Sequence, residues 1–265
     1  LTHPLLQAVE YWITPQLFEQ DLGTSCRHPV QITIGDPDEL TRLRQVSNSI
    51  SLGFCYLTLR QSPRLNKAQA QRLVSLIHRS TLLETLPLDE DLIAPSNEVL
   101  PGWSIPQWPE NHSTPLPERL TLLYHLPVEL HAMADRLRQR LAELDCELTI
   151  IFHDAKNWDG CQQFAQAVLM MGDRLIGEAP VYALEQWLRC DVLWPNLLTG
   201  AQYAHLQATL DAVQALPDER SRSEALRNVF NSLMDDAIMT PLFNYNYRIS
   251  SAGGQRTTAK RARLV

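Results

Sequence analysis

The sequence predicts an α/β fold with a mixed, mostly parallel sheet flanked by helices. The main observation is a β-α-β unit between Leu120 and Phe152, in which the strand-like runs LTLLYHL and ELTIIFH are joined by the amphipathic segment VELHAMADRLRQRLAEL. Apolar residues recur there every three or four positions, as on one face of a helix. A helical crossover of this length implies parallel strands. Such sheets place ligands at the carboxyl ends of their strands, where His125 and the His153–Lys156 turn fall.

Shorter elements are expected before this unit. Strands are predicted at Val9–Ile13, Val30–Ile34 and Leu52–Leu59. A helix is expected to begin at the Asp36-Pro37-Asp38 turn and to carry Leu40, Leu43 and Val46 on one face. A second helix, Ala68–Ser80, is clearly amphipathic.

Seven prolines fall between residues 86 and 117, and this density predicts a long loop without regular structure. Long loops inside compact domains are often functional. This one carries Trp103 and Trp108, which either stack on a ligand or anchor the loop from below. Both interpretations stay open at this point.

The elements after the β-α-β unit are mainly helical. We expect a helix at Trp158–Gln166, a strand at Ala167–Asp173 and a short helix at Ala183–Arg189. Two helices follow, Gln202–Ala215 and Ser221–Ala237, with Pro217 and Asp218 supplying the stop and the start. The last predicted strand is Thr240–Ile249.

Composition and charge exclude several classes of function. The formal net charge is −7, and the segment from Gln255 to Val265 holds four basic residues and no acid, which leaves −11 for the rest of the 265 residues. An acidic body is a poor ligand for nucleic acid, because nonspecific affinity depends on Lys and Arg at the phosphates. The basic tail could bind nucleic acid or anionic lipid, but a disordered extension over residues 251–265 is the expected state.

The chain reads as a piece of a longer protein from a reducing compartment. It starts at Leu1 without Met or an export signal, and no apolar run is long enough to cross a membrane. The five cysteines are scattered without a C-x-x-C pair, which favours the cytoplasm. Cys55 and Cys146 lie in or beside apolar runs and are expected in the core. We expect one domain over residues 1–250.

Motifs for catalysis are missing from the sequence. It contains no nucleophile elbow, P-loop or dinucleotide fingerprint. His125, His131 and His153 lack the spacing that places two imidazoles on one helix face, so we expect neither a metal nor a cofactor. A hydrolase that uses Asp173 or His153 stays as an alternative only if the two lie within hydrogen-bond reach of each other or of a shared water.

Several segments together resemble the second lobe of family 5 extracellular solute-binding proteins, the oligopeptide and dipeptide receptor type. The segments that carry the resemblance are ISLGFCYLTLR, QAQRLVSLIHRS, LIAPSNEVLPGW, PERLTLLYHL, ELTIIFHDAKNW and the run from Gln202 to Ser250. The resemblance implies one lobe of a periplasmic-binding-protein type II-like fold. Peptide receptors of this family hold the peptide amino group with a W-x-x-D element. Asp173 matches its acid, whereas Met170 takes the position of its tryptophan.

Two further segments, the run from His3 to Gly35 and MMGDRLIGEAPVYALEQWLRCD, are similar to a cytoplasmic branch of this group, the SgrR-type transcriptional regulators. The branch implies a sensor without catalysis, whose only DNA partner acts through an N-terminal winged-helix domain that this chain lacks, and which has no membrane partner. A sugar-phosphate- or peptide-like solute would bind in a cleft between two lobes. The candidate ligand-binding residues are Trp103, Asp154, Trp158, Asp173, Arg174 and Glu178. The alternative is a lobe of a periplasmic peptide-binding protein of an ABC transporter.

Overall fold

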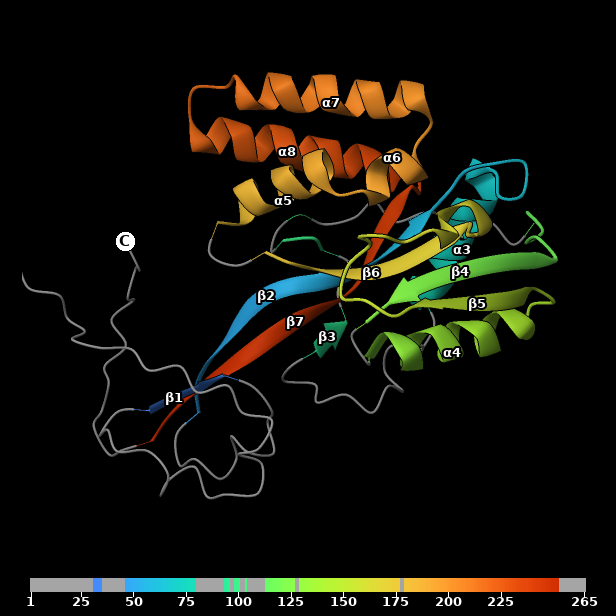
Figure 1. Cartoon of the computed structure of the whole chain (residues 1–265), viewed down its shortest axis with the longest axis horizontal. Helices are drawn as coiled ribbons and strands as arrows, with labels where there is room; N and C mark the ends of the chain where they lie inside the picture. Colours follow the sequence, from blue (N-terminus) through green and yellow to red (C-terminus); the bar gives the residue numbers. More distant parts are fainter. Residues whose placement is uncertain are drawn as a thin grey trace, which may run out of the picture. The chain divides into compact units, whose positions relative to one another are not determined.

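The structure is a computed structural model that describes residues 31–34, 46–79, 93–95, 98–100, 103, 113–126, 129–176 and 179–252 (Figure 1). The chain divides into two compact units. The smaller comprises Leu1–Ile50 with Tyr247–Val265, and the larger comprises Ser51–Asn246. The candidate ligand-binding residues all belong to the larger unit.

The described elements alternate between α and β segments in the first part of the chain, and helices dominate the second part. In chain order they are β1 (Gln31–Ile34), β2 (Val46–Leu59), α3 (Lys67–Arg79), β3 (Ile93–Pro95), β4 (Arg119–His125), α4 (Glu129–Ala142), β5 (Glu147–His153), the 3-10 turn η2 (Gln163–Gln166), β6 (Leu169–Leu175), α5 (Pro180–Cys190), α6 (Leu193–Leu197), α7 (Gly200–Gln214), α8 (Glu219–Asp235) and β7 (Met239–Ala252). In the smaller unit β1 pairs antiparallel with the last residues of β7.

The sheet of the larger unit is mixed. Its strand order is β7-β2-β6-β4-β5, and β3 also pairs with β7. Strand β4 is parallel to both β5 and β6, so the predicted β-α-β unit is confirmed as β4, α4 and β5. The pairs β2 with β6 and β3 with β7 are antiparallel. The parallel part is therefore the group β5-β4-β6.

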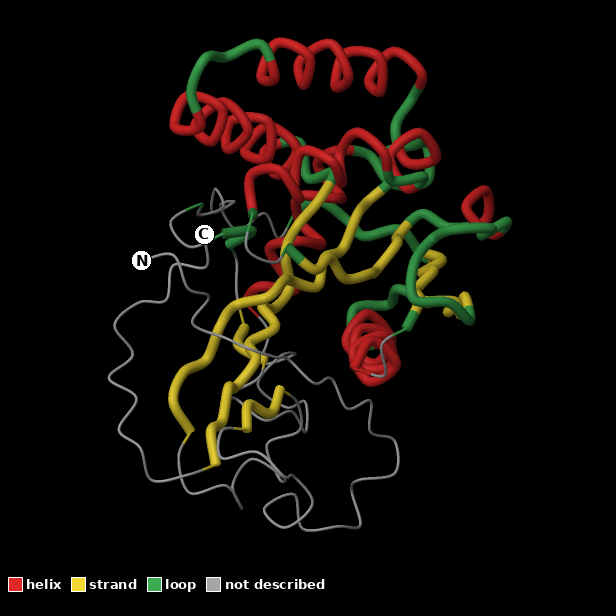
Figure 2. Tube along the Cα trace, turned by 60° about the vertical axis from the view of Figure 1, so that its left-hand side comes forward, coloured by secondary structure: helices red, strands yellow, loops and turns green. Residues whose placement is uncertain are grey.

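Both faces of this sheet are covered by apolar side chains. One face carries Phe54, Tyr56, Leu123 and Met170, which share a core with α5, α6, α7 and α8. These helices gather on one side of the sheet in the ribbon and tube views (Figures 1 and 2). The alternate strand residues share a second core with α3 and α4; among them are Cys55, Leu57, Leu122, Tyr124, Leu148 and Met171, and Cys146 just before β5 joins the same core. Burial on both faces explains why the strands read as continuous apolar runs.

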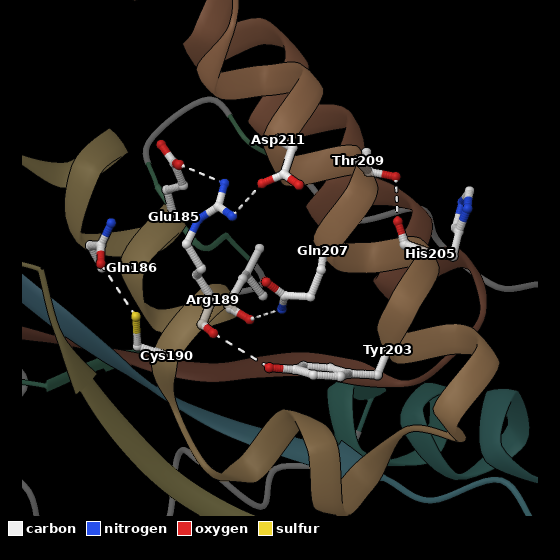
Figure 3. A network of polar contacts seen from close by, with 10 residues as sticks. Glu185, Gln186, Arg189, Cys190, Tyr203, His205, Gln207, Thr209 and Asp211 are labelled. Carbon is white, nitrogen blue, oxygen red and sulfur yellow. Dashed lines mark hydrogen bonds and ion pairs between the residues drawn. The ribbon is translucent and has the colours of Figure 1, made fainter.

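Side chains of α7 close the end of α5 (Figure 3). The hydroxyl of Tyr203 donates to the carbonyl oxygen of Arg189 at 3.4 Å, and Gln207 donates to that of Leu188 at 3.3 Å. The Arg189 guanidinium also bonds Glu185 of its own helix at 3.2 Å and Asp211 of α7 at 2.7 Å. Last-turn carbonyls have no partner within their helix, so α7 supplies partners that water would otherwise provide.

Helices α4 and α8 end in the same backbone motif, and neither uses glycine. Asp145 and Ala237 have positive φ angles of 58° and 52°. After α4, Cys146 N–H bonds the Leu141 carbonyl at 3.0 Å and Asp145 N–H bonds that of Ala142 at 3.2 Å. These are the 6→1 and 5→2 bonds of a Schellman motif, and α8 repeats them around Ala237. Each motif turns a helix directly into a strand, β5 or β7.

The structure corrects three expectations. The helix expected at Trp158–Gln166 is only the turn η2, because Gly160 at φ 71° interrupts the helical backbone. Val46 begins β2 and so does not lie on a helix; the rest of that predicted helix lies outside the described residues. The proline-rich segment contains the short strand β3, although most of the segment, with Trp108, is outside the described residues. The expected strand at Val9–Ile13 and most of the basic tail are also outside them.

The left-handed residue after α4 gives a stability prediction. Replacing Asp145 by Gly is expected to raise the free energy of unfolding by about 0.5 kcal/mol, because glycine avoids a left-handed cost of about 1 kcal/mol and loses part of that gain to a more flexible unfolded chain. The matched control is Asp135→Gly inside α4, which should lower stability by about 0.5 kcal/mol. Urea unfolding midpoints measure both. If both substitutions changed the free energy of unfolding in the same direction, the assignment of a Schellman motif at Asp145 would be wrong.

Candidate functional site

The carboxyl ends of the three parallel strands meet at one edge of the sheet. His125 ends β4 and pairs in register with His153, which ends β5. Tyr124 pairs with Met171, so the end of β6, from Gly172 to Leu175, lies at the same edge. We call His125, the turn from His153 to Gly160, and the segment from Gly172 to Leu175 the carboxyl edge. It is the part of a parallel sheet that binds ligands in α/β proteins.

Trp158 is buried although its turn is exposed. Its side chain is 2% exposed, whereas Asn157 and Asp159 beside it are exposed. The indole ring lies edge-to-face with His125 at 4.5 Å between centroids, and it also contacts Phe164 at 5.5 Å. Its Nε1 donates a hydrogen bond to the Tyr56 hydroxyl at 2.8 Å. The buried N–H therefore has its partner on β2, three strands away from β5.

Gly172 makes room for this arrangement. It pairs in register with Tyr56. A Cβ atom at Gly172 would lie 2.5 Å from His125 Nε2 and 2.7 Å from the Tyr56 hydroxyl oxygen. The hydrogen atom of glycine is thus what lets the imidazole and the phenol approach the backbone of β6.

His125 is a neutral, buried imidazole. It is 1% exposed, its Nδ1 bonds the carbonyl oxygen of Leu126, and the same nitrogen lies 3.9 Å from Asp173 Oδ1. A carbonyl oxygen can only accept, so Nδ1 carries the proton. Burial lowers the pKa of His125; the Leu126 carbonyl opposes this shift and His153 adds to it.

A second polar group lies on the helical side of the edge. The Asp191 carboxylate, just after α5, accepts from the Leu193 N–H at 2.9 Å. Burial raises the pKa of Asp191, while the Leu193 hydrogen bond and the charge of Arg174 lower it. Arg174 is half-buried, and its Nε has no hydrogen-bond partner within the described part of the chain. Burial also raises the pKa of the Tyr56 hydroxyl well above its usual value, and Asp191 raises it further, so the phenol stays protonated.

The structure places four of the six candidate residues at the carboxyl edge. Asp154 is exposed directly after β5, Trp158 lies under the same turn, and Asp173 and Arg174 end β6. Trp103 is buried against Phe230 of α8, at 5.9 Å between ring centroids, as expected for an anchor of its loop. Glu178 is outside the described residues. Whether any of the six contacts a ligand stays a prediction.

Sequence reasoning did not select Tyr56, Gly172 or Asp191 for the site. Tyr56 sits inside a continuous apolar run, and Asp191 follows an ordinary helix. Nothing in their local sequence distinguishes them from core and cap residues. His125 was placed at the strand end by its position in the predicted unit, but was not chosen as a ligand contact.

The described residues offer neither a metal site nor a membrane-spanning helix. No three of their side chains among His, Cys, Asp and Glu are grouped so that they could hold a metal ion. None of the helices in the described ranges is both long and apolar enough for a transmembrane segment.

The space at Gly172 gives a second stability prediction. Gly172→Ala is expected to lower the free energy of unfolding by about 1–3 kcal/mol, because the new methyl group overlaps His125 and Tyr56. Gly200→Ala is the control: Gly200 begins α7, and a methyl group there would have nothing within 4 Å, so the substitution should be neutral or slightly stabilising. Urea unfolding measures both variants. An equal loss in the free energy of unfolding for the two would show that a methyl group at Gly172 does not overlap its neighbours.

The pKa of His125 predicts a pH dependence. Its folded pKa is lowered, so the unfolded chain binds a proton more readily. The contribution of His125 to the free energy of unfolding is complete above the unfolded pKa of about 6.5. It is lost as the pH falls through the folded pKa. His125→Gln, which can still donate to the Leu126 carbonyl, should therefore lose less stability than the parent between about pH 7 and pH 5. Groups that do not interact with His125 titrate in both proteins, so their contributions cancel in the difference. If the stability of His125→Gln and that of the parent changed with pH in the same way, the lowered pKa of His125 would be contradicted.

Comparison with known proteins supports the fold. No family model matches the chain. The uncharacterized protein YbaE of Escherichia coli (strain K12) is 65% identical over 254 residues, which cover 96% of this chain and 45% of that protein. The chain therefore spans less than half the length of this curated relative.

Solved structures of substrate-binding proteins share the fold at low sequence identity. The ABC transporter substrate-binding protein CtaP from Listeria monocytogenes is 15% identical with a TM-score of 0.60, covering 84% of this chain and 51% of its own. NikA from Brucella suis, in complex with Fe(III)-EDTA, is 13% identical with a TM-score of 0.61, covering 83% of this chain and 52% of its own. Haemophilus influenzae OppA, in complex with the peptide RPPGFSPFR, is 12% identical with a TM-score of 0.56, covering 91% of this chain and 49% of its own. The predicted mixed α/β fold, a sheet flanked by helices as in type II-like periplasmic binding proteins, is thus confirmed.

Proposed function

We propose that this chain is a ligand-sensing, solute-binding-like domain of a cytoplasmic transcriptional regulator, and that a small solute binds at its carboxyl edge. The observation that carries the proposal is that Asp154, Asp173 and Arg174 all lie at the carboxyl ends of the parallel strands. The buried side chains of His125 and Trp158 lie at the same edge, and Asp173 Oδ1 is 3.9 Å from His125 Nδ1. An apolar base with a few convergent polar groups is the usual composition of a small-molecule site.

The chemistry of the edge favours a ligand with hydrogen-bond donors. The carboxylates of Asp154 and Asp173 accept from an ammonium group or from hydroxyls, as a peptide or a sugar would present. The guanidinium of Arg174 suits a phosphate or a carboxylate. Stacking on Trp158 is not part of the proposal, since the indole is buried. Met170, at the tryptophan position of peptide receptors, is fully buried as well. A sugar-phosphate- or peptide-like solute satisfies both kinds of polar group.

The regulatory role rests on the resemblance of the run from His3 to Gly35 and of MMGDRLIGEAPVYALEQWLRCD to SgrR-type regulators. In this proposal a second lobe completes the cleft, and a winged-helix domain outside this chain contacts DNA. Transport is the alternative, because the similar solved structures include an ABC transporter substrate-binding protein. The coding sequence upstream separates the two: a helix-turn-helix favours regulation, and an export signal favours transport.

The ligand contact is tested with the full-length gene product. Titration calorimetry with short peptides and sugar phosphates should detect a binder, and Asp173→Asn should weaken it about 10- to 100-fold, the effect of losing one charge-assisted hydrogen bond of about 1.5–3 kcal/mol. Asp135→Asn, on the exposed side of α4, is the control and should bind like the parent. Unchanged affinity in Asp173→Asn would remove that residue from the site. Failure of every peptide and sugar phosphate to bind would contradict the proposed ligand class.

A further inference from the structure

We infer that Trp158 is a positioning residue: its hydrogen bond to Tyr56 fixes the turn from Asp154 to Gly160, and with it the Asp154 carboxylate, against the carboxyl edge. The inference deepens the proposed function and rests on it, because Asp154 is one of the proposed ligand contacts. It changes the role expected for Trp158 from contacting the ligand to holding the residue that contacts the ligand.

The turn has few other attachments to the sheet. Ala155 accepts from the Leu126 N–H at 3.0 Å and donates to the His153 carbonyl at 2.8 Å. Beyond Ala155, the backbone hydrogen bonds of the turn within the described part of the chain are local: Asp159 N–H to the Asn157 side chain at 3.0 Å, and Cys161 N–H to the Trp158 carbonyl at 3.1 Å. Gly160 ends the turn with a φ angle of 71°, a backbone conformation that residues other than glycine rarely adopt. Trp158 is therefore the buried side chain by which the exposed part of the turn is attached.

The socket for the indole is built by strands distant in sequence. Tyr56 on β2 accepts the N–H from 102 residues away. His125 on β4 packs edge-to-face against the ring at 4.5 Å, and His153 on β5 stacks on it at 6.4 Å. Gly172 on β6 leaves the space that Tyr56 and His125 occupy. Apolar contact alone would tolerate rotation of the ring, whereas the hydrogen bond selects one orientation because a buried N–H without a partner is unfavourable.

A direct consequence is that Tyr56 and Trp158 act as one unit. Tyr56→Phe removes the acceptor and leaves the ring, and Trp158→Phe removes the donor and leaves an aromatic side chain. Each should free the turn by the same route, so the double variant should be no worse than either single one. Two residues that held the turn independently of each other would instead add their effects on its exchange.

Hydrogen–deuterium exchange of the full-length gene product, without ligand, tests the inference. In Tyr56→Phe and in Trp158→Phe the amides of residues 154–161 should exchange about tenfold faster, with no further increase in the double variant and no change in α7 and α8. Tyr124→Phe is the matched control: it also deletes a hydroxyl in this sheet, one that bonds His131 Nδ1 at 2.6 Å, and it should leave residues 154–161 unchanged. In nitrogen-15 NMR spectra the Trp158 indole signal should shift in Tyr56→Phe and not in Tyr124→Phe.

Unchanged exchange at residues 154–161 in Tyr56→Phe, or additive effects in the double variant, would overturn the inference. If Tyr56→Phe does not fold, Trp158→Phe alone decides: faster exchange confined to the turn supports the role, and protection equal to the parent refutes it. Exchange is measured without any solute, so this result stands apart from the calorimetric test. A fixed turn in a protein that binds no peptide or sugar phosphate would leave the positioning intact and refute the proposed ligand class.

Discussion

Parallel pairing of β4 with both β5 and β6 is the constraint on which the rest of the larger unit depends. Parallel neighbours cannot be joined by a tight turn, so the chain must cross over the sheet between them, and α4 is one such crossover. Crossovers cover the faces of the sheet, and the strands are then apolar on both sides. The same pairing brings three carboxyl ends to one edge, where the chain leaves the sheet and polar side chains can accumulate.

The carboxyl edge contains two kinds of polar group, which differ in exposure. His125, Tyr56 and the indole N–H of Trp158 are buried, and burial keeps the imidazole neutral and the phenol protonated. Asp154 and Asp173 keep access to solvent. Among these five residues the neutral side chains are buried and the two carboxylates reach solvent, which avoids the cost of burying those charges. This arrangement also gives a rigid base from which a few charged groups project, as ligand recognition requires.

The sequence predicted those parts of the fold that depend on local pattern. The β-α-β unit, α3, α7, α8 and β6 follow from periodicity, and the position of Asp154, Asp173 and Arg174 at strand ends follows from them. The Schellman turns at Asp145 and Ala237 were not predictable, because the usual glycine signal is missing from both. The burial of Trp158 was not predictable either, since it depends on Tyr56, Gly172 and other strand residues that only the tertiary fold brings together.

The central claim is that a solute binds at the carboxyl edge. The most direct measurement maps chemical-shift changes in nitrogen-15-labelled full-length protein during titration with the peptide or sugar phosphate that binds best. The account predicts that shifts in this chain concentrate at residues 125–126, 153–161 and 172–176, which close the three parallel strands. Shifts confined to the opposite edge, around Arg119 and Glu147, or to the α7–α8 layer would contradict it.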